Sequence, residues 1–517
     1  MQLSKTSMES SEMKASSRGN LTLDKDFNVP DLKEDIDKVI AVKGSVTLEE
    51  CECLVDRVKL KGLVHYRVLY TTPNEKRPLC YMEGVLPFSE NVHIEGVLPT
   101  DHCRVRMDVE DLNISLVNSR KIIVKALIGY AIHVYGEDPV DIATELENGN
   151  GVECLYKKLS YTKRMVDNKD IFRIKEEMTL PQAKPNIGEL VWYSVNMNSI
   201  ETKLIDQAIQ LNGELNLFVI YQAEEEEQPL QYLTMEIPFA GTVEVAGANS
   251  DMVAVIETGL SDVEVLIRPD MDGEERGLEV LASVTLDLQV YEDVEVTLLS
   301  DVFAPNVEIV DHQIPFDYEM ILTKNAAKTR VSERVKLNKN QDKMMQICQV
   351  EGSVKIDEEQ VTEEGLQVDG VVLATILYIS SDDRHPISSM EAMVPFTYLV
   401  ELNNLREGDR YEICPQLEQL SAVMLDGDEI ELKAQVDLNI AAFEKGRTYG
   451  IDEIEVQPLP YEKIKALPAM VGYIVKNGDT LWSIAKKYYT TIDNIRQINH
   501  LENDKLTEGQ KLLIVKS

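Results

Sequence analysis

Three copies of one residue pattern run along this chain of 517 residues, and they constrain its fold more than any other feature. Each copy has a glycine, a tyrosine eight residues later, a proline eight residues after that, and a Pro-Phe pair nine residues further on. The copies start at Gly62, Gly213 and Gly370, so the unit recurs after 151 and then 157 residues. Such a period is too long for a solenoid and predicts tandem domains.

Each copy shows the hydrophobic pattern of β-strands. Apolar residues alternate with polar ones up to the tyrosine, as expected for a half-buried strand. A second alternating segment closes each unit and ends before Tyr135, Tyr291 or Phe443. The prolines cannot donate to a sheet ladder, so we place them at strand edges and entries. The in-phase positions are Val64, Tyr66, Val68 and Tyr70, then Leu215, Leu217, Val219 and Tyr221, then Val372, Ala374, Ile376 and Tyr378.

These patterns predict tandem β-sandwich-like domains over residues 28–150, 165–320 and 328–456. The units also open alike, and we align residues 42–46 with 191–195 and 350–354. Glu224–Glu227 lies in a polar turn of the second unit; we interpret this run as a solvated hairpin tip, with a cation or basic-partner site as the alternative.

The segments outside the units are polar or rich in proline. Residues 1–27 begin with a polar, Ser-rich stretch that predicts a disordered tail. Residues 457–469 contain three prolines and predict a semi-stiff spacer, which would hold the C-terminal segment away from the rest of the chain.

The C-terminal segment, residues 470–517, has a different pattern. A short β-prone run from Tyr473 ends at the turn pair Asn477-Gly478. Asp479 or Thr480 can cap a following helix, and Thr491 can cap a second one. Residues 511–515 form a closing strand. The first helix has an apolar stripe at helical spacing, made of Leu481, Ile484, Ala485 and Tyr488, and the second has Ile492, Ile495 and Ile498.

This segment resembles the LysM family, whose modules bind ligands and do not catalyse reactions. The matching residues run from Tyr473 to Ala485, then include Asn499, and then run from Gly509 to Val515. The resemblance implies a small α+β module with strand–helix–helix–strand order. Trp482 lies beside the apolar stripe, so it either fills the small core or forms a partly exposed anchor for a partner.

The charge of the chain is unevenly divided and limits its partners. The net charge is −38, but residues 470–517 contain 7 basic and 5 acidic residues, a balance of +2, which leaves −40 on the remainder. The strong negative charge of residues 1–469 repels nucleic-acid phosphates and anionic membranes, so we expect no nucleic-acid partner. No window is apolar enough for a transmembrane segment, and the N-terminus lacks the apolar core of a signal peptide, so we expect a cytoplasmic protein.

No pattern of reactive residues predicts catalysis. The seven cysteines are an odd number, which favours reduced thiols over a disulfide framework. Cys51 and Cys53 are the only close pair and lack the further ligands that zinc needs, so a structural role is favoured. The histidines form no metal-type pair, and there is neither a nucleophile elbow nor a phosphate loop. We therefore expect no metal, no cofactor and no enzymatic activity.

The three repeated units joined to a LysM segment resemble the SPOCS-domain family of spore coat morphogenetic proteins of spore-forming Clostridia, the SipL-like group. The Gly…Tyr…Pro…Pro-Phe framework carries this resemblance. It implies a non-enzymatic scaffold in the mother-cell cytoplasm, at the forespore surface and in the spore coat. It also implies that the LysM module binds the coat-nucleating ATPase SpoIVA, with other coat proteins as further partners.

The match to the LysM motif implies which residues contact the partner. One alternative is a wall or cortex protein whose LysM module binds the N-acetylglucosamine (GlcNAc) glycan of peptidoglycan. A second is an enzyme with an unrecognised site in a β-sandwich, which no nucleophile, base or metal signal supports. The partner-binding residues implied are Ile474, Gly478, Asp479, Thr480, Leu481, Trp482, Asn499 and Leu501.

Overall fold

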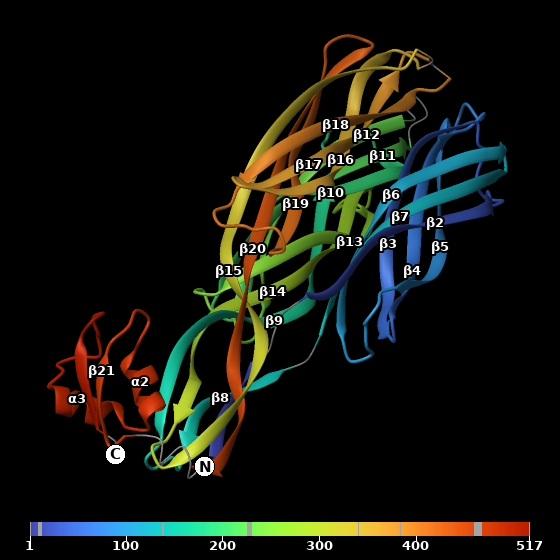
Figure 1. Cartoon of the computed structure of the whole chain (residues 1–517). Helices are drawn as coiled ribbons and strands as arrows, with labels where there is room; N and C mark the ends of the chain where they lie inside the picture. Colours follow the sequence, from blue (N-terminus) through green and yellow to red (C-terminus); the bar gives the residue numbers. More distant parts are fainter. Residues whose placement is uncertain are drawn as a thin grey trace.

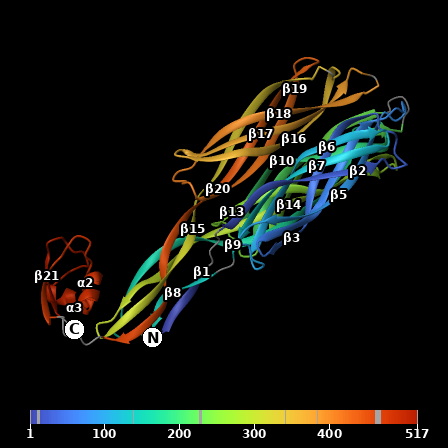
Figure 2. The same ribbon diagram turned by 45° about the vertical axis from the view of Figure 1, so that its right-hand side comes forward.

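The computed structural model describes residues 2–8, 13–136, 139–224, 230–339, 341–382, 384–459 and 468–515. Over these residues the chain is mainly β, with two short helices near its C-terminal end (Figure 1). Three β-sandwiches lie together, a narrow stalk of long strands extends from them, and a small module lies beside the far end of the stalk (Figure 2). The predicted fold class is confirmed. Glu225–Glu227 of the predicted hairpin tip fall outside the described residues.

Each sandwich is built from six strands in two three-stranded antiparallel sheets. One sheet contains the second, third and fourth strands, and the other has the order first, sixth, fifth. Domain 1 comprises β2 (Met13–Asn28), β3 (Lys38–Leu54), β4 (Arg57–Thr71), β5 (Leu79–His93), β6 (His102–Asn118) and β7 (Lys121–Tyr135). Domain 2 comprises β9 (Glu153–Thr179), β10 (Ile187–Ile205), β11 (Ala208–Ala223), β12 (Leu230–Glu244), β13 (Val253–Pro269) and β14 (Glu275–Phe303). Domain 3 comprises β15 (Val307–Lys336), β16 (Met344–Thr362), β17 (Gly365–Ser380), β18 (Ile387–Glu401), β19 (Arg410–Met424) and β20 (Glu429–Pro458).

The repeated tyrosine occupies the same place in all three sandwiches. Tyr70, Tyr221 and Tyr378 lie near the ends of the central strands β4, β11 and β17, and each is 0% exposed. Each hydroxyl donates a hydrogen bond to the main-chain carbonyl of the residue 36 positions earlier, which ties the central strand to the segment before the sheet. The acceptors are Glu34, Pro185 and Asp342, at 3.2, 3.0 and 3.3 Å.

The glycine and the Pro-Phe pair of the repeat lie opposite each other on neighbouring strands and pack together. In domain 1 Pro87 lies on the edge strand β5 opposite Leu63, and Phe88 lies opposite Gly62. The phenyl ring covers the glycine so closely that a Cβ atom at residue 62 would lie 2.7 Å from it. The same pairing recurs in domains 2 and 3. The predicted edge position of these prolines and the equivalence of the three copies are confirmed.

The predicted alignment of the opening strands is wrong for the second unit by two residues. Lys43 pairs with Arg67, and the structurally equivalent pairs are Ser194 with Phe218 and Glu351 with Thr375. The equivalent of residue 42 is therefore residue 193 and not 191. The Val…Val spacing of residues 191–195 matches the other two units by coincidence, whereas the pairing with the central strand fixes the register.

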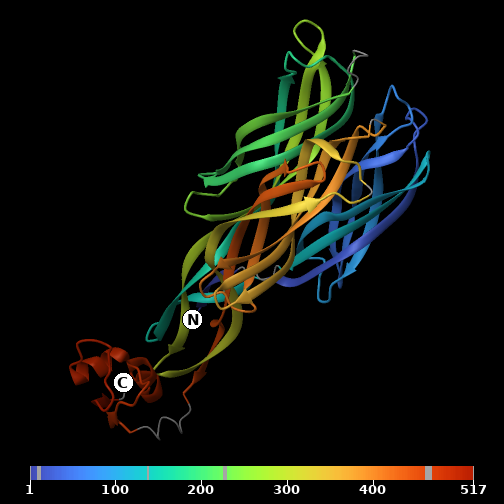
Figure 3. The same ribbon diagram turned by 90° about the horizontal axis from the view of Figure 1, so that it is seen from above.

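Equivalent positions of the three sandwiches meet in one shared core. Trp192, 1% exposed, is the largest fully buried side chain of the described residues and lies in this core. Figure 3 shows the three similar sandwiches beside one another, and each of them contributes side chains to this core. The meeting positions are Ile40, Val191 and Cys348 of the second strands, Leu69, Ile220 and Leu377 of the third strands, and Leu79, Leu230 and Ile387 of the fourth strands.

A polar contact joins the three domains beside this core. Lys43, Ser194 and Glu351 are equivalent residues, and they meet one another. The Nζ of Lys43 lies 3.0 Å from Oε2 of Glu351, and the Ser194 hydroxyl donates to the same oxygen at 2.7 Å. Asn196 and Gln349 donate to it at 3.4 Å each. The three copies thus differ in sequence where they touch, so each domain has a defined neighbour.

The stalk consists of three two-stranded ribbons, one from each domain. β1 (Gln2–Met8) pairs with β8 (Val140–Glu147), residues 153–162 of β9 pair with the end of β14, and the start of β15 pairs with the end of β20. The ribbons pack around their own apolar core, and the three domains are therefore joined twice, in the body and in the stalk. This core contains Met8 and Ile142 of the first ribbon, Leu159 and Leu298 of the second, and Phe316 of the third.

The stalk corrects two predictions about domain limits. The disordered tail predicted for residues 1–27 is wrong where the structure describes it, because residues 2–8 form β1 and residues 13–28 form β2. These strands find hydrogen-bond partners in β8 and β7, far along the sequence. The limits predicted near residues 150–165 and 320–328 are crossed by the continuous strands β9 and β15.

The C-terminal module has the predicted strand–helix–helix–strand order. β21 (Met470–Ile474) pairs with β22 (Lys511–Val515), with α2 (Leu481–Tyr488) and α3 (Ile492–Asn499) between them. Thr480 and Thr491 cap the two helices, since each hydroxyl accepts a hydrogen bond from the main-chain N–H three residues later. The core of the module contains Val475, Leu481, Ile484, Ala485, Ile495, Leu512 and Ile514.

Candidate binding site

The first loop of the module is a rigid turn built around Asp479. Gly478 has φ +88°, a left-handed conformation that favours glycine. The Asp479 carboxylate accepts hydrogen bonds from the main-chain N–H of Lys476 at 2.8 Å and from the Tyr473 hydroxyl at 2.7 Å. These two bonds lower the pKa of Asp479 below its ordinary value, and the hydrogen bond to Asp479 raises the pKa of Tyr473 to about 12. Asp479 therefore has a structural role, because its carboxylate accepts two hydrogen bonds from within the module and these fix the shape of the loop.

Thr480 and Leu481, which follow this turn, both have structural roles. Thr480 caps α2 in a reciprocal arrangement, because its main-chain N–H donates to the Ser483 hydroxyl at 3.0 Å and its own hydroxyl accepts from the Ser483 N–H at 3.1 Å. Leu481 is 2% exposed and packs in the core of the module. The placement of Leu481 in a contact surface is corrected: the first stripe position of α2 faces inward.

The second loop is held to the closing strand by Asn499. Its amide donates to the carbonyl of Leu513 at 2.7 Å, and its carbonyl oxygen accepts from the Leu513 N–H at 2.6 Å. Leu501 follows, half-buried, with its N–H donating to the carbonyl of Arg496 at 3.0 Å. Ile474, at the end of β21, is 57% exposed. Ile474 is thus a large apolar side chain exposed on the surface of the module, whereas Asn499 holds the second loop against β22.

Trp482 contacts the stalk of the same chain. Its indole N–H donates to the Asp301 carboxylate at 2.7 Å, and its ring meets that of Phe303 edge to face, with centroids 4.8 Å apart. Lys486 pairs with the same carboxylate, and the Tyr489 hydroxyl donates to Glu308 at 3.0 Å. Trp482 is therefore neither a plug confined to the core of the module nor a free anchor.

These contacts correct the prediction about the spacer. Residues 460–467 of the spacer lie outside the described residues, but the module that follows is not held away from the acidic part of the chain. It contacts the end of the stalk through an aromatic pair and acidic side chains. The proline content of the spacer predicted its stiffness, but it carried no information about which surface the LysM module contacts.

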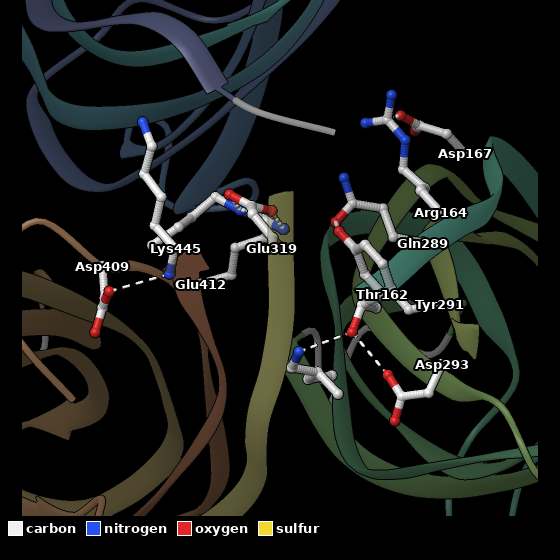
Figure 4. A network of polar contacts seen from close by, with 12 residues as sticks. Thr162, Arg164, Asp167, Gln289, Tyr291, Asp293, Glu319, Asp409, Glu412 and Lys445 are labelled. Carbon is white, nitrogen blue, oxygen red and sulfur yellow. Dashed lines mark hydrogen bonds and ion pairs between the residues drawn. The ribbon is translucent and has the colours of Figure 1, made fainter. Parts of the chain in front are cut away.

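A second concentration of charged residues lies where the sandwiches meet the stalk (Figure 4). Arg410 is almost fully buried and makes a bidentate pair with Glu319, at 3.1 and 2.8 Å, while its guanidinium lies 3.7 Å from the centre of the Phe443 ring. Nearby, the Tyr291 hydroxyl donates to Gln289 at 2.8 Å. The ion pair lies within domain 3, and beside it the ring of Tyr291 from domain 2 packs on that of Phe443 from domain 3, with centroids 5.0 Å apart. Paired charges next to an aromatic contact between two domains form a structural junction.

The thiols lie in the sandwiches and the stalk. All seven cysteines fall within the described residues and are free. Cys51 and Cys103 face each other between β3 and β6, and their contact lowers the pKa of Cys51, while burial raises that of Cys53 to about 12. No group of three or more His, Cys, Asp or Glu side chains among the described residues could hold a metal ion.

Comparison with known families agrees with this architecture. The SPOCS domain of SipL matches residues 35–117, 186–268 and 343–425, one match in each sandwich, and the LysM domain matches residues 473–515. The fold and these matches define a multidomain protein of SPOCS and LysM domains. More narrowly, the chain belongs to the SipL-like family of proteins, with three SPOCS domains and a C-terminal LysM domain.

Curated relatives match the LysM segment alone. The probable endopeptidase p60 of Listeria grayi is 46% identical over 52 residues, which are 10% of this chain and 10% of that protein. The probable peptidoglycan endopeptidase LytE of Bacillus subtilis is 52% identical over 40 residues, 8% of this chain and 12% of that protein. The probable N-acetylmuramidase of Lactococcus lactis is 46% identical over 43 residues, 8% of this chain and 10% of that protein.

This chain covers about a tenth of each of these relatives, so their enzymatic names concern segments that it does not share. No solved structure matches the chain. In the part of the chain that the structure describes, no helix has the length and apolar character needed to cross a membrane.

Proposed function

We propose that this chain is a non-enzymatic scaffold for spore coat assembly, which binds the coat-nucleating ATPase SpoIVA through its LysM module. It would act in the mother-cell cytoplasm, at the forespore surface. The observation that carries this proposal is the combination of three SPOCS domains in one body with a LysM module at the end of a stalk. SPOCS and LysM domains are not catalytic, and a scaffold needs a firm frame with a binding module displayed at its surface.

The proposed contact surface consists of the two loops of the module and the end of β21. Ile474 supplies an exposed apolar side chain, which is the kind of group that contributes strongly to binding once it is desolvated. Gly478, Asp479 and Thr480 form the rigid first loop beside it, while Asn499 and Leu501 form the second. A pre-organised surface loses little entropy on binding, which favours affinity.

A test of this surface compares Ile474→Glu with Leu32→Glu in the full chain. Both place a carboxylate on an exposed apolar position, but Leu32, 96% exposed, lies in domain 1. If Ile474 is buried against SpoIVA, its replacement weakens binding by about 2 kcal/mol or more, roughly 30-fold, while Leu32→Glu binds as the wild type does. Equal affinities of the two variants for purified SpoIVA would contradict the proposed surface.

A second candidate function is binding of GlcNAc glycan by the same module. The identity of 46–52% between this LysM segment and those of proteins named as wall enzymes favours it. Competition separates the candidates: soluble chitin fragments should leave the complex with SpoIVA intact. If the fragments displace SpoIVA, the surface formed by the two loops is a sugar site and the second candidate takes precedence.

A further inference from the structure

The outer face of α2 presents three side chains of different chemistry. Trp482, Lys486 and Tyr489 follow one another at intervals of four and three residues, so they project from one side of the helix and its C-cap. They offer a flat aromatic ring with an N–H donor, an ammonium group and a phenol. Such a face fits a partner that combines an exposed aromatic ring with carboxylates.

The tip of the stalk, defined here as Asp301 and Phe303 of β14 and Glu308 of β15, offers that combination. Both oxygens of the Asp301 carboxylate are used, one by the Trp482 indole at 2.7 Å and the other by Lys486. Phe303 is only 5% exposed and packs with the core of the LysM module, although it belongs to domain 2.

Charge and burial favour this pairing. Residues 470–517 carry a balance of +2, whereas the rest of the chain carries −40, so attraction brings the module to an acidic tip. The carboxylate of Glu153, at the start of β9, interacts electrostatically with Asp493 and Arg496 of α3. The second helix therefore lies beside the stalk as well. Without the module, the phenyl ring of Phe303 would lose its cover at the end of a strand.

We propose that the outer face of α2 is an intramolecular docking surface whose occupant is the stalk tip, and that docking gates the LysM module. The indole of Trp482 cannot contact Asp301 and an external protein at the same time. In this proposal SpoIVA contacts Trp482 together with Ile474 and the loops, so the module must be released before the whole surface can bind, although Ile474 itself is exposed in the docked state. The gate rests on the proposed function; the docking itself does not.

Tryptophan fluorescence tests the docking without any partner. The chain has two tryptophans, and Trp192 is 1% exposed in the shared core, so changes report on Trp482. In the full chain, Asp301→Ala and Phe303→Ala should each shift the emission to longer wavelength and increase quenching by acrylamide. Glu455→Gln, an exposed position on the same stalk, should change neither. Wild-type quenching in both Asp301→Ala and Phe303→Ala would overturn the docking.

Affinity for SpoIVA tests the gate in the same variants. Apparent affinity scales with the fraction of molecules in the competent state, so a docked-to-free ratio of about ten implies roughly tenfold tighter binding by Asp301→Ala. Unchanged or weaker binding by a variant whose fluorescence shows release would overturn the gate. If no form of the chain binds SpoIVA, the proposed function and the gate both fail, while the fluorescence result still decides the docking.

Discussion

Removing the carboxylate of Glu351 tests whether the three SPOCS domains form one unit. This side chain is 18% exposed and accepts from Lys43 of domain 1, from Ser194 and Asn196 of domain 2, and from its neighbour Gln349. Glu351→Ala leaves the ammonium of Lys43 without its partner and the Ser194 hydroxyl without its acceptor. Both groups lie at a domain junction that solvent reaches only in part.

The size of the effect follows from these exposures. Loss of one partner from a fully buried ion pair costs about 3–5 kcal/mol. Because Lys43 is 34% exposed, water replaces part of the lost interaction, and we expect about 2–3 kcal/mol, including the unpaired hydroxyl. Replacement of both charges together, Lys43→Met with Glu351→Met, should cost less than Glu351→Ala, since no isolated charge remains.

Urea denaturation followed by circular dichroism, with calorimetry in parallel, measures both variants. If the junction couples the domains, Glu351→Ala lowers the stability of the whole body and the main transition stays single. The reasoning is refuted if Glu351→Ala changes stability by less than about 0.5 kcal/mol, the usual range for exposed surface positions. A new, separate transition for one domain would equally refute it.

Three further predictions concern other parts of the chain. Gly62→Ala would place a Cβ 2.7 Å from a phenyl ring and should destabilise domain 1 by about 1–3 kcal/mol, whereas Gly472→Ala, with open space around it, should be nearly neutral in the same urea titration. His385 bridges domains 3 and 1 by hydrogen bonds to Asp37 and Asp382, which raise its pKa above 6.5. Its contribution to stability is therefore complete below pH 6.5 and is lost as pH rises through the raised value; His385→Gln should remove this dependence of the urea midpoint. Alkylation of the denatured protein without reductant should add seven adducts by intact-mass measurement, and fewer would reveal a disulfide.

The sequence was sufficient to predict the parts of the fold that repeat or alternate. Tyr70, Pro87 and Phe88 recur at fixed spacing because each is fixed by contacts inside one sandwich. The LysM helices could be predicted because their caps and apolar stripes are local. Local patterns therefore gave the sandwiches and the module.

The stalk and the position of the module depend on contacts between distant residues. Residues 2–8 read as a polar tail, since a narrow ribbon buries few of their side chains, and β8, more than 130 residues later, supplies their hydrogen bonds. Trp482 was predicted either to fill the small core or to anchor a partner, and its contact with Asp301, 181 residues earlier, has no signature near either residue. The shared core around Trp192 likewise requires three domains to be brought together.

Co-purification from sporulating cells measures the proposed function most directly. The full chain and a form lacking residues 469–517 are recovered by the same affinity tag on the first residues, and SpoIVA is quantified in each eluate. The three SPOCS domains have their own cores, so the shortened form should fold without the LysM module. Circular dichroism of the shortened form checks that it is folded. We predict that SpoIVA accompanies the full chain and is lost with residues 469–517. Recovery of SpoIVA in equal amounts with the folded, shortened form would contradict the assignment of partner binding to the LysM module.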